Sequence, residues 1–357
     1  MLTLGNETSC DETAVCLLKN GKVLSESVAS SASIHSAYGG VIPEIASRRH
    51  LESVLPCMDE ALKKANVKLK DIRLIAATGG PGLLGSVLIG TSFAKSLALS
   101  LNKPLIFVDH VLAHAFAGQF GRKQPVFPFL GLVISGGHSV MIHWKSMTGA
   151  EIIGRTVDDA AGEVFDKVSA MLGWEYPGGP AVEKKASGII ADGKRFPKPM
   201  VRKEHHNFSF SGLKTAVFYE VKKLTDQGSL TEEAKCRIAA DFQEAICETI
   251  YLKTKKAMQE KKIKHLVVGG GVSANSVLRK KLQSLDGELG VEVCFPEMFF
   301  CTDNASMIAF LGAALYQHAK KKKTADLRNQ MLRFEPYSNF FSNLNPKGTP
   351  LKIKLNS

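Results

Sequence analysis

Several common signatures are missing from this sequence of 357 residues. Its seven cysteines form no C-x-x-C pair and are odd in number, which favours free thiols in a reducing compartment. The first residues, MLTLGNETSCDET, lack the charged and apolar regions of a signal peptide and the Arg-rich character of a transit peptide. No uninterrupted apolar run reaches the roughly 18 residues that a membrane span needs. We therefore expect no membrane segment and a cytoplasmic location, with the mitochondrial matrix as the alternative.

Three catalytic or nucleotide-binding motifs are also missing. The segment GGPGLLGS lacks the lysine of a Walker A loop, and GGGVSAN does not fit the dinucleotide fingerprint G-x-G-x-x-G. Val111 stands where the metallopeptidase motif H-E-x-x-H has its glutamate. P-loop nucleotide binding, a Rossmann fold and metallopeptidase chemistry are therefore disfavoured.

The bulk composition is that of an ordinary globular chain, with 45% hydrophobic and 22% charged residues, and the length suits two sizeable cores. The formal net charge of +12 favours a polyanionic partner such as nucleic acid, because neutralised phosphates release counterions. Solvated lysines on a basic protein explain the same charge, and both interpretations stay open at this point.

A hairpin arrangement occurs twice in the predicted α/β pattern. Residues 2–8 and 13–28 read as strands with a turn at Asn20-Gly21, and residues 129–144 with 146–157 repeat the arrangement. The loops between the first two strands of each set are ETSCDET and SGGHS, and such loops can cradle phosphate oxygens. Two of them facing each other would hold a nucleotide, although either alone could be a plain hairpin connection.

His110 and His114 form half of a possible metal site. They lie four residues apart, beside Asp109, so on a helix both imidazoles can face one ion. A catalytic site usually has three protein ligands, and the third must come from elsewhere in the chain. The alternative is a pair of partly buried histidines that are bonded to the backbone.

Nine motifs appear in one order along the chain: ETSCDET, GGPGLLGS, H-x-x-x-H, SGGHS, DDAAGEVFDK, YPGGP, FSFSGLKTA, GGGVSAN and CTDNASMIA. Over residues 3–320 this order resembles the tRNA adenosine threonylcarbamoyltransferase family, TsaD and its relatives. The resemblance implies an α/β fold of two ribonuclease-H-like lobes of the actin, sugar-kinase and heat-shock-chaperone (ASKHA) superfamily, with a central nucleotide cleft. We expect lobe I over residues 1–109 and 304–325, lobe II over residues 110–303, and a C-terminal tail over residues 326–357.

The resemblance also implies site residues. The metal ligands would be His110, His114 and Asp303, holding one divalent ion per subunit, either iron or zinc. No catalytic base is evident. The substrate-binding positions would be Val133, Ile134, Ser135, Gly136, Gly137, Asp166, Gly179, Glu183 and Asn275.

The implied activity is transfer of the threonylcarbamoyl group from threonylcarbamoyl-AMP to N6 of adenine 37 in tRNAs that read ANN codons, with release of AMP. Expected partners are tRNA, a threonylcarbamoyl-adenylate synthase that supplies the substrate, and TsaB-like and TsaE-like helper proteins or a second copy of the chain. Two alternatives on the same fold are an ATP-dependent small-molecule kinase and a nucleotide-gated interaction protein without catalysis.

Overall fold

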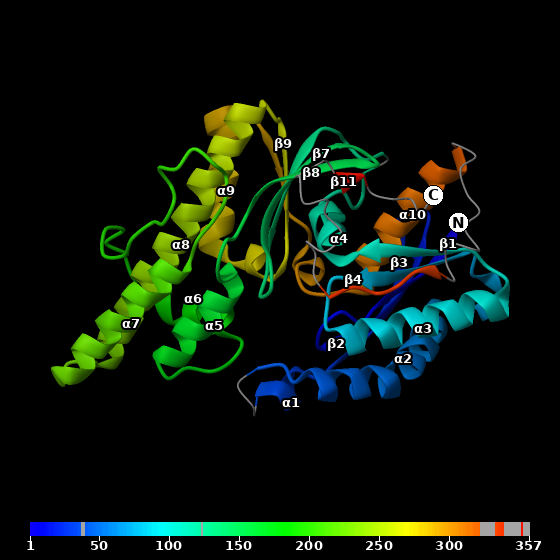
Figure 1. Ribbon diagram of the computed structural model, residues 1–357, viewed down its shortest axis with the longest axis horizontal. Coiled ribbons are helices and arrows are strands. Elements are labelled where there is room, and N and C mark those ends of the chain that lie inside the picture. The colour runs from blue at the N-terminus through cyan, green and yellow to red at the C-terminus, as the bar shows by residue number, and fades with distance from the viewer. Residues whose placement is uncertain (37–39, 123, 322–332, 339–350, 353–357) are drawn as a thin grey trace. The chain divides into compact units, whose positions relative to one another are not determined.

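The computed structural model describes residues 1–36, 40–122, 124–321, 333–338 and 351–352 (Figure 1). The chain forms two compact units. The first consists of Met1–Pro125, Lys145–Ala150 and Thr302–Ser357, and the second of Val126–Trp144 and Glu151–Cys301.

The first unit is built on a five-stranded sheet in the order β3-β2-β1-β4-β5. The first three strands form the predicted antiparallel meander, and β4 and β5 run parallel to β1. Asn20 and Gly21 both have positive φ angles, of 52° and 80°, as a tight hairpin turn requires. The strands are β1 (Leu2–Glu7), β2 (Glu12–Lys19), β3 (Lys22–Ser30), β4 (Leu74–Gly80) and β5 (Leu105–Asp109).

Helices cover both faces of this sheet, and strand β2 is therefore buried on both sides. Val15 and Leu17 pack in a core with α2 and α3, whereas Ala14, Cys16 and Leu18 pack with α10. This alternation follows from the two-residue period of a strand. Figure 1 shows α2 and α3 side by side. The helices are α1 (Ala32–Ser36), α2 (Pro43–Ala65), the 3₁₀ turn η1 (Leu69–Asp71), α3 (Leu84–Leu101), α4 (His110–Ala117) and α10 (Ala305–Lys321).

Helix α3 bears on the expectation that no segment spans a membrane. By length and composition it could cross a membrane, since its 18 residues have a mean hydropathy of 1.4. Scattered serines, Thr91 and Lys95 interrupt its apolar runs, which is why the sequence shows no continuous span. In this fold α3 packs against β4 and α2, and core helices of this kind pass the same test.

A second sheet has the order β10-β9-β6-β7-β8-β11; most of its strands belong to the second unit, whereas Lys145–Ala150 and β11 are assigned to the first. Strands β6 and β7 pair antiparallel, as the repeated hairpin pattern predicted, and β9 runs parallel to β6. The strands are β6 (Phe129–Ile134), β7 (Ser139–Ser146), β8 (Gly149–Arg155), β9 (His265–Gly269), β10 (Glu292–Cys294) and β11 (Leu351–Lys352).

The helices of the second unit enclose one large hydrophobic core with β6 and β9. Phe165 of α5 and Phe242 of α8 meet edge to face there, at a ring-centroid distance of 5.1 Å. The helices are α5 (Ala161–Met171), α6 (Gly178–Ala186), α7 (Ser211–Asp226), α8 (Glu232–Lys261) and α9 (Ser276–Leu289), with the 3₁₀ turns η2 (Gly271–Ala274) and η3 (Met298–Phe300).

The boundaries of the compact units do not coincide with the expected lobe boundaries, which stay a prediction. The first unit continues to Pro125 because α4 packs on α10 and follows β5 directly, so His110 and His114 belong to it. It resumes at Thr302, one residue before Asp303. Of the predicted tail, residues 333–338 and 351–352 are described, and the remainder lies outside the described residues.

Candidate metal centre and nucleotide-binding surface

Helix α4 brings the two histidines together. It begins immediately after β5, where Asp109 caps it by accepting a hydrogen bond from Leu112 N at 2.9 Å. All eight residues of the helix are buried. His110 and His114 lie on one face, with their rings edge to face and the centroids 4.7 Å apart. The spacing of four residues therefore produces the shared face that the sequence predicted.

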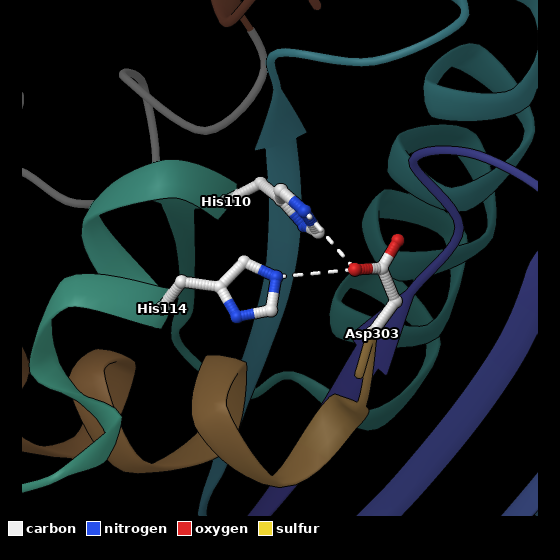
Figure 2. Close-up of side chains that lie close together, drawn as sticks. All are labelled: His110, His114 and Asp303. Atoms are coloured by element: carbon white, nitrogen blue, oxygen red, sulfur yellow. Dashed lines mark hydrogen bonds and ion pairs between the residues drawn. The ribbon is translucent and has the colours of Figure 1, made fainter. Parts of the chain in front are cut away.

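Asp303 supplies a carboxylate to the same point from just before α10. Its Oδ1 lies 3.1 Å from His114 Nε2 and 3.4 Å from His110 Nε2. Figure 2 shows both imidazoles directed toward this carboxylate. One potential ligand atom from each of the three residues lies within 4.8 Å of the others. Two imidazole nitrogens and one carboxylate oxygen are a donor set that suits a divalent transition metal, so these residues could hold one ion.

Glu7 is a member of this cluster that the sequence analysis did not identify. Its buried carboxylate lies 2.9 Å from His110 Nδ1 and accepts a hydrogen bond of 2.6 Å from Thr78 Oγ1. When His110 Nδ1–H donates to Glu7, the lone pair of Nε2 is left for a metal ion. An acidic residue at the end of the otherwise uncharged strand LTLGNE was the available signal.

Negative charge dominates the electrostatics of the cluster. Burial alone would lower the pKa of His110, but the charges of Glu7 and Asp303 outweigh it and hold that pKa well above the usual range. Burial lowers the pKa of His114. Burial and, after it, the charge of Asp303 raise the pKa of nearby Glu12 to about 8. The cluster therefore favours a cation at its centre.

A second candidate site is formed by glycine-rich segments of the second unit. The predicted stretch Val133–Gly137 ends β6 and continues into the loop before β7. A Cβ atom added at Gly136, Gly137, Gly179 or Gly271 would meet nothing within 4 Å. These backbones consequently offer open surface for the close approach of a ligand.

Neighbouring glycines hold these segments against one another. A Cβ atom on Gly270 would lie 2.5 Å from Ile134 O, and one on Gly162 would lie 2.7 Å from Ser135 O. The β6 end therefore contacts both the β9 end and the start of α5. The backbones of Ser135 and Gly136 are therefore held directly against Gly162 at the start of α5.

Asp166 joins α5 to the start of α6. Its Oδ1 accepts a hydrogen bond of 2.7 Å from Gly178 N, and the side chain is half-buried. Burial, the larger effect, raises the pKa of this carboxyl although the bond from Gly178 lowers it. Asp166 therefore positions the residue directly before Gly179, a role that the sequence pattern did not predict.

Asn275 is the N-cap residue of α9, and the side chain of Glu183 reaches the same helix end from α6. Glu183 Oε1 accepts a hydrogen bond of 2.8 Å from Ser276 N. Glu183 and Ser276 both line a cavity of about 400 Å³. Asn275 is buried, and its amide is engaged within the fold: Oδ1 accepts from Leu278 N at 3.0 Å and Nδ2 donates to Gln243 Oε1 at 2.8 Å. Glu183 thus lies on a cavity wall, whereas Asn275 caps the helix behind it. Nucleoside contact by either residue stays a prediction.

Solved structures share this fold at low sequence identity. Full-length HypF matches 89% of this chain and 46% of its own length, with a TM-score of 0.60 and 14% identity. Component A of (R)-2-hydroxyglutaryl-CoA dehydratase from Acidaminococcus fermentans matches 90% of this chain and 99% of its own, with a TM-score of 0.51 and 19% identity. Together with the two mixed-sheet α/β units, these matches confirm the predicted two-lobed α/β fold.

Sequence relatives are much closer. The family model of TsaD, tRNA N6-adenosine threonylcarbamoyltransferase, matches residues 22–310. The transferase of that name from Thermosipho africanus (strain TCF52B) is 46% identical over 317 residues, which are 89% of this chain and 95% of the relative. The one from Fervidobacterium nodosum (strain ATCC 35602 / DSM 5306 / Rt17-B1) is 40% identical over 342 residues, 96% of this chain and 98% of the relative. The chain belongs to the tRNA N6-adenosine threonylcarbamoyltransferase family.

Proposed function

We propose that this protein transfers the threonylcarbamoyl group from threonylcarbamoyl-AMP to N6 of adenine 37 in tRNAs that read ANN codons, releasing AMP. The observation that carries the proposal is the convergence of His110, His114 and Asp303 in a chain of this family. The activity of a small-molecule kinase would not require these three converging metal ligands. A chaperone-like interaction protein would need a further substrate-binding domain, whereas the family match spans most of the chain. Neither alternative is therefore favoured.

The metal centre would hold one iron or zinc ion through His110 Nε2, His114 Nε2 and an oxygen of Asp303. When bound, such an ion acts as a Lewis acid that stabilises negative charge on the oxygen of the activated carbonyl. The protein's own contribution is orientation. Glu7 fixes the tautomer and the ring position of His110, and the cap at Asp109 fixes the first turn of α4.

The nucleotide part of the substrate would lie on the glycine-lined surface of the second unit. Its phosphate would approach the backbone at Gly136 and Gly137, which face open space. Asp166 would accept a hydrogen bond from a ribose hydroxyl, with Oδ1 already holding Gly178 N. Adenine 37 lies in the unpaired anticodon loop of tRNA, where a base can be turned out toward a protein.

The activity also requires a source of the adenylate substrate, partner proteins and a cellular compartment that contains tRNA. A separate synthase provides the adenylate from threonine, bicarbonate and ATP. Helper proteins resembling TsaB and TsaE, or a second copy of the chain, complete the working assembly. The cytoplasm is the proposed location, with the mitochondrial matrix as the alternative.

A reconstituted reaction tests the function. Purified protein is incubated with tRNA, threonine, bicarbonate, ATP and the synthase, with and without helper proteins, and the modified nucleoside is quantified after digestion of the tRNA. We expect the modification with the parent protein and its loss in His114→Ala, together with the loss of bound metal. His265→Ala is the matched control, because His265 pairs with Glu292 in the second unit and should leave both unchanged. Absence of the modification under all these conditions would refute the proposal.

A further inference from the structure

The short segment 333–338, here called the C-terminal strap, lies against the sheet of the first unit near the ends of β4 and β5. The Phe334 ring stacks on Phe107 of β5, with centroids 4.0 Å apart and an angle of 17° between the ring planes. Lys95 Nζ of α3 donates a hydrogen bond of 2.7 Å to Phe334 O. Tyr337 N donates one of 3.2 Å to Gly79 O of β4. The strap is therefore held by main-chain, side-chain and ring contacts at once.

Strand β4 is shaped to receive the strap. A Cβ atom on Gly79 would lie 2.4 Å from Phe334 Cζ, and one on Gly80 would lie 2.2 Å from Tyr337 O. Gly80 also has a φ angle of +136°, which side chains rarely adopt. The two glycines at the end of LIAATGG thus make room for Phe334 and Tyr337, and any larger residue would displace the strap.

One carboxylate connects the strap to the metal centre. Tyr337 Oη donates a hydrogen bond of 2.7 Å to Asp109 Oδ2, while Asp109 Oδ1 accepts from Leu112 N in the first turn of α4. Asp109 directly precedes His110, and His114 follows one turn later. The orientation of this carboxylate therefore links the hydroxyl of Tyr337 to the start of the helix that carries both histidines.

We infer that Tyr337 is a positioning residue for the metal centre. This inference rests on the metal site of the proposed function. Without the hydroxyl, Asp109 Oδ2 loses a donor in a closely packed position and the carboxylate can rotate away from Leu112 N. The first turn of α4 would then loosen, and the two imidazoles would no longer be held at a fixed separation. Because metal–ligand distances may vary by only a few tenths of an ångström, histidines that are held less firmly bind the ion less tightly.

The test uses the full-length protein, freed of metal with a chelator and titrated with Co²⁺ alone. Visible absorption reports the ligand geometry, and competition with an indicator gives the dissociation constant. Tyr337→Phe should raise that dissociation constant by about 3- to 10-fold. Replacing a residue that directly bonds a metal ligand typically lowers metal affinity by about 10- to 100-fold, and Tyr337 is one contact further from the ligands. Tyr251→Phe is the matched control: it removes a tyrosine bond to Glu288 Oε2 in the second unit and should leave Co²⁺ binding unchanged.

A double-mutant cycle assigns the effect to the bond. Asp109→Asn retains an acceptor for the cap of α4, and Tyr337→Phe should have a smaller effect in that background than in the parent. A lower melting temperature of metal-free Tyr337→Phe with unchanged Co²⁺ affinity would make the strap merely structural and overturn the inference. Equal effects in both backgrounds would overturn it as well. A parent protein that binds no Co²⁺ would contradict the proposed metal site itself, which separates the two failures.

Discussion

At the scale of single residues, Asp166 shows how the structure changes an interpretation made from the sequence. Its position off the apolar stripe of AAGEVFDKVSAMLG is typical of an exposed side chain, whose replacement would cost the fold little. The side chain is instead half-buried and accepts a hydrogen bond from Gly178 N. Substitution therefore affects α6 as well as any bound ribose, and the two effects need different variants.

Asp166→Asn and Asp166→Ala separate these two roles. The asparagine keeps an acceptor for Gly178 N but loses the charge, so we expect adenylate affinity to fall by about 10- to 150-fold, which corresponds to about 1.5–3 kcal/mol, with little change in melting temperature. The alanine should lose affinity and also about 0.5–1.5 kcal/mol of unfolding free energy. Calorimetric titration and thermal melting of the same samples measure both. Unchanged affinity in Asp166→Asn would remove this residue from the ribose site.

The metal ligands illustrate what residue spacing can and cannot predict. His110 and His114 are four apart on one helix, so their proximity follows from local geometry alone. Asp303 lies 189 residues from His114 along the chain, and only the family resemblance assigned it. Glu7 was missed because its contact with His110 depends on how β1 and α4 are brought together, which no local pattern encodes.

At the scale of elements, two adjacent carboxylates hold the start of α7. Asp158 accepts hydrogen bonds from Ser209 Oγ and Phe210 N, just before the helix begins. Asp159 accepts from Ser211 Oγ and Lys214 Nζ in its first turn. The helix has no cap from its own N-cap residue, so these distant side chains take over that role. A negative charge at a helix N-terminus is also favourable.

The pH dependence of stability should reveal Asp159. Burial would raise its pKa, but the bonds from Lys214, Ser211 and Lys167 outweigh burial and lower it to about 2, below the usual 3.8. The stabilisation is therefore present above about pH 4 and is lost as the pH falls toward 2. Asp159→Asn should lower the unfolding free energy of the second unit by about 1–2 kcal/mol at neutral pH, allowing for partial exposure.

Thermal melting from pH 7 down to pH 3 measures this effect. The difference in melting temperature between the parent protein and Asp159→Asn should become smaller below about pH 4. Asp226→Asn, at the opposite end of α7, is the control for the loss of one negative charge from the same helix. A difference that stays constant over the whole range would mean that the charge of Asp159 contributes nothing.

Most of the helices and strands agree with the local pattern of apolar and turn residues in the sequence. The strands around Asn20-Gly21 and the repeated hairpin of β6 and β7 were predicted, because apolar periodicity and turn residues agree there. Apolar spacing typical of a helix is also present in the segments that form α5, α9 and α10. Helix α2 begins at Pro43, since a proline is well suited to the first turn of a helix, whereas apolar residues at helical spacing become evident in the sequence only from Arg48 onward. The strap was not predicted, because its six residues have no periodicity and depend on contacts with β4 and β5.

At the scale of the whole molecule, the net charge of +12 points to a polyanionic partner. The adjacent arginines of ASRRH, Arg48 and Arg49, are candidates for tRNA contact by charge, but they form ion pairs with Glu44 and Glu52 on α2. Their positive charge is thereby largely compensated, and the solvated helix face is the better interpretation for this pair. Other lysines and arginines must then carry the electrostatic attraction to tRNA.

Salt titration of tRNA binding tests this attraction. If about three phosphates are neutralised, affinity should fall by at least about 10-fold between 50 and 200 mM salt, because each neutralised phosphate of a single strand contributes about −0.7 to the log–log slope. Filter binding at four salt concentrations gives that slope. An affinity independent of salt would show that the net charge plays no part, whereas Arg48→Ala and Arg49→Ala should leave the slope unchanged.

The most direct measurement supplies threonylcarbamoyl-AMP itself, together with tRNA and any required helper proteins, and omits threonine, bicarbonate, ATP and the synthase. Nucleoside analysis quantifies the modified adenosine, and the same sample is assayed for AMP and for protein-bound metal. For the parent protein we predict modified adenosine and AMP in equal amounts, and for Asp303→Asn the loss of both products together with the bound metal. Undiminished modification by a metal-free Asp303→Asn protein would contradict the account.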